Sequence, residues 1–173
     1  SLSNRNNQDA EAQSKESLSN MSMMMQQMVN IKQGFNQDSV NEMVDKFQNL
    51  LQDVLYLSSQ EEQLKSDTKQ ASRNSPRVRE LAQRQQLLQD QLNSVTNKML
   101  KLSNETFAMT PDIGRGIGKA NASMEKAKQE LTERNLNQAG KNHDLAMEGL
   151  NKAAQGLFNS MQNMMESGSA SGF

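Results

Sequence analysis

Apolar side chains recur in this chain at alternating spacings of four and three residues, and no glycine occurs between Gly34 and Gly114. Such spacing places them on one face of a long α-helix. We call such a row of inward-facing positions a seam, and comparable seams occupy residues 78–106, 113–131 and 136–165. The scattered Val and Ile residues are too few for a sheet. The chain is therefore predicted to be all-α. The clearest seam reads Met43, Phe47, Leu50, Val54, Leu57, Glu61, Leu64, Thr68 and Ala71.

Turn and capping residues divide these seams into about five helices. Ser75-Pro76 and Thr110-Pro111 each combine an N-cap residue with proline at the first helical position. The predicted helices span residues 5–33, 38–73, 76–108, 111–134 and 136–166. Because the connections are short, consecutive helices should be antiparallel neighbours. The prediction is one elongated, coiled-coil-like antiparallel bundle over residues 1–166, followed by a flexible Ser/Gly tail over residues 167–173.

Amide side chains are unusually abundant, with 20 Gln and 19 Asn among 173 residues. They are expected to cover the outer faces of the helices. The formal net charge of −1 argues against nucleic acid as a partner, because phosphate binding requires a basic surface. No apolar run is long enough to cross a membrane. The chain has no Cys, which excludes disulfides and thiolate chemistry.

Catalytic motifs are missing from the sequence. The segment Gly114–Lys119 lacks the spacing and the preceding strand of a phosphate-binding loop, and its glycines are better suited to a close helix approach. His143 is the only histidine, so one chain cannot assemble a metal cluster of several histidines, and its seam position favours fixing the helix register over acting as a catalytic base. We expect no catalytic, cofactor-binding or metal-ligating residue. Glu61, Thr68, Gln85 and His143 occupy seam positions, where polar side chains can select helix pairing and register.

Two methionine groups are candidate contacts for a partner protein. Their pliable side chains suit either core filling or a contact with another helix. Soft thioethers can also bind Cu(I), and exposed apolar helix faces can bind lipid, so a metal- or lipid-binding protein is an alternative. The candidate contact residues are Met21, Met24, Met25, Met28, Met161, Met164 and Met165.

Several short segments appear in the order typical of one known family. The chain resembles the Gln-rich, helical C-terminal region of large, uncharacterised bacterial membrane-anchored proteins, a domain-of-unknown-function family, over roughly residues 40–165. This resemblance implies an extracytoplasmic setting in the bacterial cell envelope, with membrane segments outside this fragment. The family has no established site residues to carry over. The segments are LYLSSQEEQL (55–64), LAQRQQLL (81–88), LSNETF (102–107), TPDIGRGIGKA (110–120) and AMEGLN (146–151).

These observations predict a non-enzymatic structural or protein-interaction module. Its partner would be a second copy or an unknown envelope protein, and membrane contact would come only through a segment outside this fragment. A signal-transmitting helical bundle is the alternative, because polar seam residues can allow two packings to interconvert.

Overall fold

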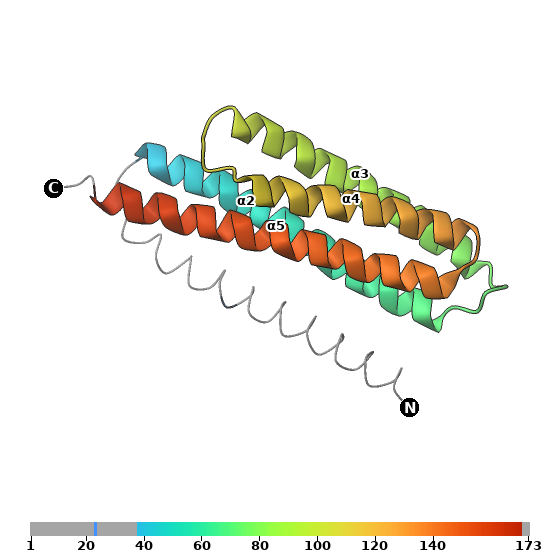
Figure 1. The fold of residues 1–173 in the computed structure, drawn as a ribbon. Helices are drawn as coiled ribbons and strands as arrows, with labels where there is room; N and C mark the ends of the chain where they lie inside the picture. Colours follow the sequence, from blue (N-terminus) through green and yellow to red (C-terminus); the bar gives the residue numbers. More distant parts are fainter. Residues whose placement is uncertain (1–22, 24–37, 171–173) are drawn as a thin grey trace.

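The computed structural model describes Met23 and residues 38–170, and these form an all-α protein without strands. Four long helices make up the bundle: α2 (Asp38–Gln70), α3 (Arg77–Ser103), α4 (Pro111–Thr132) and α5 (Leu136–Ala170) (Figure 1). This confirms the predicted fold class. The described residues contain one bundle helix fewer than the five expected. The first predicted helix, residues 5–33, lies outside the described residues apart from Met23, which is helical.

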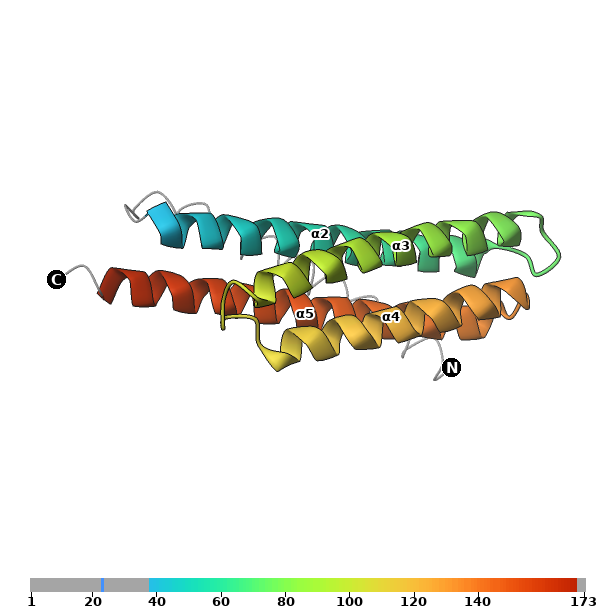
Figure 2. The same ribbon diagram turned by 90° about the horizontal axis from the view of Figure 1, so that it is seen from above.

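The four helices run alternately up and down along a common long axis (Figures 1 and 2). The α2–α3 and α4–α5 connections lie at one end of the bundle, and the α3–α4 connection lies at the other. Helix α5 packs against both α2 and α4, while α3 packs against the same two helices on the opposite side. The predicted seams point inward and include the fully buried Phe47, Leu92, Met124 and Leu157. The antiparallel arrangement is therefore confirmed.

Several helix ends differ from the prediction. Helix α2 ends at Gln70 instead of residue 73, α3 ends at Ser103 instead of residue 108, and α4 ends at Thr132 instead of residue 134. The α3–α4 connection must reach Pro111 through an extended Thr110 (ψ 153°), because the residue before proline disfavours helical geometry. Ser160 Oγ also donates to Ala108 O at 2.6 Å and holds this connection against α5.

A further difference lies at the C-terminal end of α5. This helix continues to Ala170, so residues 167–170 of the predicted flexible tail are helical. The remaining residues, 171–173, lie outside the described part of the chain. Extending an existing helix fixes one residue for each added hydrogen bond and needs no new nucleus, which is why Ser and Gly residues can be added at its end.

The α4–α5 turn has an unusual helix stop. Arg134 has a left-handed φ of 60°, which normally favours glycine. Asn135 N donates to Glu130 O at 2.7 Å and Arg134 N donates to Leu131 O at 3.0 Å, the two bonds of a Schellman motif. The Arg134 guanidinium donates to Arg73 O at 2.7 Å in the α2–α3 connection. The side chain thus joins the two connections at this end of the bundle.

Helices α4 and α5 touch through glycine backbones. A Cβ at Gly116 would lie 2.7 Å from Gly149 O, and a Cβ at Gly149 would lie 2.6 Å from Ala120 N. The close helix approach expected of the glycines in Gly114–Lys119 is confirmed at Gly116. In contrast, Gly114 and Gly118 have open space where a Cβ would stand. The segment Gly114–Lys119 therefore forms part of a regular helix and contributes one glycine to its packing.

Ion pairs at heptad spacing fix the register of α2 against α3. Successive partners advance by seven and then fourteen residues along α2, while their counterparts retreat by the same steps from Glu105, just beyond the end of α3, into that helix. This is the geometry of an antiparallel coiled-coil edge. The pairs are Lys46–Glu105 at 2.6 Å, Asp53–Lys98 at 2.7 Å and Asp67–Arg84 at 2.5 Å.

Candidate functional site: a buried polar cluster and the cleft beside it

Four polar side chains meet inside the bundle, where α2, α3 and α5 face one another. Glu61 and Thr68 come from α2, Gln85 from α3 and His143 from α5, and each is at most 1% exposed. His143 Nδ1 lies 2.8 Å from Glu61 Oε2, and Gln85 Nε2 donates to Glu61 Oε1. His143 Nε2 lies 3.4 Å from Thr68 Oγ1. We call these four residues the polar cluster.

The hydrogen-bond directions constrain the protons of the polar cluster. Thr68 Oγ1 donates to Leu64 O at 2.8 Å, so its single proton is engaged and its oxygen can accept from His143 Nε2. We therefore assign a proton to Nε2. The contact between His143 and Glu61 is then either an imidazolium–carboxylate pair or a neutral imidazole accepting from a carboxylic acid. In both forms the pair as a whole is neutral, which suits its complete burial.

One polar atom of the cluster has no partner within the described part of the chain. Gln85 Oε1 is buried and accepts no hydrogen bond there. An unsatisfied buried acceptor costs about 1–3 kcal/mol. The polar cluster is thus a costly element of the core, and packing alone does not explain it.

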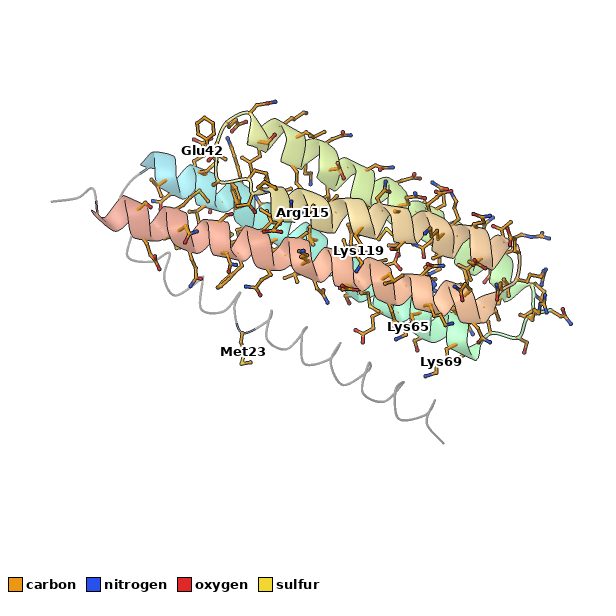
Figure 3. All side chains as sticks on the ribbon, viewed as in Figure 1. Met23, Glu42, Lys65, Lys69, Arg115 and Lys119 are labelled. Atoms are coloured by element: carbon orange, nitrogen blue, oxygen red, sulfur yellow. The ribbon has the colours of Figure 1, made fainter. Side chains whose placement is uncertain are left out.

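A cleft of about 430 Å³ opens beside the polar cluster, between the end of α2 and the start of α5. Thr68 belongs to both features, because it lines the cleft and contacts His143. Lys65 on α2 forms an ion pair with Asp144 on α5, with 2.6 Å between Nζ and Oδ1. Figure 3 shows Lys65 and Lys69 projecting at this end of the bundle.

The predicted polar seam residues are thus all buried, and the structure brings them into mutual contact. The contact between Glu61 and Gln85 could have been expected from their equal distance in sequence from the turn between α2 and α3. Glu61 and Gln85 lie twelve residues on either side of Arg73, which sits in the α2–α3 connection, so a symmetric hairpin places them at the same level. That signal is available in the sequence but requires the turn to be located first.

The methionine candidates divide into two groups. Met21, Met24, Met25 and Met28 lie outside the described residues. Near the other end of the chain, Met161 and Met165 are buried, and Met164 is partly buried and packs against the core. Their positions favour core filling for this second group.

Metal ligands do not gather in the described residues, where no group of three or more His, Cys, Asp or Glu side chains could hold an ion. Within the same part of the chain, none of the helices combines the length and apolarity that a membrane crossing needs. The fold and the polar cluster together define an all-α helical bundle with a specified internal register.

The family follows from the sequence match. Residues 56–172 match the family described as "Domain of unknown function (DUF4175)", and the chain belongs to this family. This agrees with the resemblance to a domain-of-unknown-function family. No curated protein and no solved structure matches the chain.

Proposed function

We propose that this chain is a non-enzymatic structural and protein-interaction module of its family. One observation carries the proposal: the buried polar groups are directed at other helices of the same bundle. Glu61 and His143 bind each other, and Ser58 Oγ donates to Asn151 Oδ1 at 2.8 Å across the same pair of helices. Groups engaged in this way fix which helices pair and in which register.

The α2–α5 contacts show how specific this register is. Ser58 pairs with Asn151, and Lys65 pairs with Asp144. The second contact lies seven residues further along α2 and seven residues earlier along α5 than the first. One antiparallel register therefore satisfies both contacts. A rod of fixed register presents its outer faces in a constant geometry, which is the property that a scaffold requires.

The outer surface supports a protein partner. Large apolar side chains on the described surface stand singly among polar ones, and Phe107 is fully exposed in the α3–α4 connection. Aromatic side chains of this kind often serve as anchors at protein interfaces. The partner would be a second copy or another envelope protein. The extracytoplasmic, membrane-anchored setting is part of the proposal and is supported by the resemblance of residues 40–165.

A photo-crosslinking amino acid at Phe107 tests the interaction role. In cells that produce the full-length protein, it should give a discrete crosslinked protein band. The same amino acid at Leu87, an exposed apolar position on α3, is the matched control for nonspecific capture. Equal capture at both positions, or no crosslink at any exposed apolar site, would argue against a docking surface around Phe107. Protease accessibility in intact spheroplasts tests the extracytoplasmic side.

A signal-transmitting bundle is the second candidate, and the polar cluster is the observation that favours it. A core with an unsatisfied Gln85 Oε1 can have a competing packing of similar free energy. Replacing Glu61 and Gln85 by Leu should then change the distances between spin labels on α2 and α3. Unchanged distances in this variant would leave the scaffold role as the better account.

A further inference from the structure

We propose that this bundle associates end to end with a second copy of itself. Phe107, in the α3–α4 connection of one copy, enters a hollow between the α2–α3 and α4–α5 connections of the next. The two surfaces lie at opposite ends of the molecule (Figure 1). The inference rests on the proposed role of the chain as a protein-interaction module with Phe107 as an anchor, and it names the partner.

The hollow is suited to an aromatic ring. Its volume of about 530 Å³ leaves room for a phenylalanine side chain. Arg73 and Arg134 contribute a guanidinium group from each of the two connections, and such groups stack on aromatic faces. Leu136 adds an apolar surface. The complete lining is Arg73, Glu133, Arg134, Asn135, Leu136 and Asn137.

The end that carries Phe107 has an excess of carboxylates. Beside the α3–α4 connection, Glu42 and Glu105 share the ammonium group of Lys46, at 3.2 Å and 2.6 Å. Two acids with one base leave this group with a net negative charge. Glu105 is two residues from Phe107 in the chain, and Figure 3 shows Glu42 at the same end of the bundle.

The end that carries the hollow has the reverse arrangement. Arg77 and Arg84 share the carboxylate of Asp67, at 3.0 Å and 2.5 Å, so this group has a net positive charge. Guanidinium groups pair with carboxylates in a bidentate geometry, which suits them to an acidic partner surface. Five of the seven arginines in the chain lie in the α2–α3 connection, the first half of α3 and the α4–α5 connection: Arg73, Arg77, Arg79, Arg84 and Arg134.

The contrast extends to all charged residues of the two ends, whether or not they are paired. Residues 63–88 and 124–146, which form the end with the hollow, contain ten basic and six acidic side chains. Residues 38–53, 98–116 and 154–170, which form the end with Phe107, contain four basic and seven acidic ones. Opposite ends therefore attract each other and like ends repel. This complementarity favours a second copy as the partner.

A contact between opposite ends does not close on two copies. Each copy uses its Phe107 end once and its hollow once, so the association is heterologous and continues into a chain of copies. The contact is limited to the width of the bundle, and small interfaces are weak. Association should therefore be reversible and should weaken as salt screens the charges.

Sedimentation equilibrium of the full 173-residue chain at rising concentration measures the association. The average mass should increase past that of a dimer without a plateau, and 1 M NaCl should lower it. Phe107→Ser and Arg73→Glu should each weaken association about tenfold or more. Both side chains are exposed, and circular dichroism checks that the helices are retained. Leu87→Ser on α3 and Lys119→Glu in the middle of the bundle (Figure 3) are the matched controls and should associate like the wild type.

A mixture of the two variants separates this contact from a symmetric one. Phe107→Ser keeps an intact hollow, and Arg73→Glu keeps an intact Phe107. The mixture should therefore form a complex of two different copies and grow no further. A symmetric contact between two Phe107 side chains would not recover in the mixture, and that result would overturn the inference.

Two other outcomes would also overturn it. One is a wild type that stays monomeric up to about 1 mM. The other is a loss of association in Leu87→Ser or Lys119→Glu as large as in the two test variants. A monomeric chain whose Phe107 position still crosslinks to a different protein in cells would exclude the second copy as the partner, but the proposed interaction role of the module would stand.

Discussion

His143 Nδ1 lies 2.8 Å from Glu61 Oε2 in the centre of the bundle, and neither side chain has exposed surface. Removing one partner leaves the other polar side chain buried in a low-dielectric core without its partner. We therefore expect Glu61→Ala and His143→Ala each to lower the free energy of unfolding by about 3–5 kcal/mol. Urea unfolding followed by circular dichroism measures this change.

The double replacement Glu61→Leu/His143→Leu is the control for this pair. Because no buried charge remains, its destabilisation should be well below the sum of the two single Leu variants. Additive effects would show that the two side chains do not act as a pair.

Gly149 should not tolerate a methyl group. In Gly149→Ala the new Cβ would meet Ala120 N and Gly116 O, each at 2.6 Å, and backbone atoms cannot move aside as side chains can. The α4–α5 pair must separate, and we expect a loss of about 2–3 kcal/mol, at the upper range for overpacking. Gly118→Ala, where a Cβ meets open space, should stabilise the protein by about 0.5–1 kcal/mol. Equal thermal midpoints for the two variants would contradict the close contact.

Arg134 combines a left-handed backbone with a useful side chain, and two substitutions separate these roles. Arg134→Ala loses the bond to Arg73 O and keeps the unfavourable φ of 60°. Arg134→Gly loses the same bond but relieves the backbone. The Gly variant should therefore be more stable than the Ala variant by about 1 kcal/mol. An Ala variant at least as stable as the Gly variant would contradict the left-handed assignment.

Asp67 should make stability depend on pH in the acidic range. The hydrogen bond from Arg84 is the main cause that lowers the pKa of this carboxyl below its ordinary value of 3.8, and the charge of Arg77 adds to it. A depressed pKa in the folded state stabilises the fold above the unfolded-state value, and this contribution is lost as pH falls through the lowered one. The stability difference between the wild type and Asp67→Asn should thus be largest near neutral pH and shrink below about pH 4.

The control for Asp67 is Asp90→Asn on the exposed face of α3, where Asp90 accepts a bond from Gln86 at 2.8 Å. Thermal melts between pH 2.5 and 7 should show a pH-dependent difference for Asp67→Asn and a much smaller one for Asp90→Asn. A constant difference for Asp67→Asn across this range would show that the Arg84 contact does not depend on the carboxylate charge.

The ion pairs between α2 and α3 should contribute mainly to register. Asp53–Lys98 is partly exposed, so Asp53→Lys should cost only about 0.5–1 kcal/mol at low salt and less at 1 M NaCl. The swapped variant Asp53→Lys/Lys98→Asp should regain most of that loss. Urea unfolding at both salt concentrations checks the effect, and a swap that regains nothing would mean that the two charges do not interact in solution.

Helix positions and core faces could be read from the spacing of apolar residues. Phe47, Leu64 and Leu92 are all buried as their seams require. Helix ends were less predictable where the cause was not local. The break between residues 134 and 136 was predicted although no Gly or Pro marks it, but the left-handed conformation of Arg134 and its bond to Arg73 O could not be read from the sequence.

The same limit applies to the candidate site. Polar residues at Glu61, Thr68, Gln85 and His143 were recognisable as interruptions of apolar seams. Periodicity within one helix states which side chains face inward but not how far a neighbouring helix is shifted along its axis. The cleft also escaped prediction, because Lys65 and Lys141 are separated by 76 positions in the chain and become neighbours only when α5 returns beside α2.

The sequence by itself determined that this protein is all-α, that its helices are long and antiparallel, and which face of each is buried. These properties depend on the 3.6-residue period of the helix and on short connections. Only the tertiary structure decided that Glu61 faces His143 and that Gly116 meets Gly149. Such pairings depend on the axial shift between helices, which is set jointly by all the side chains at their interfaces.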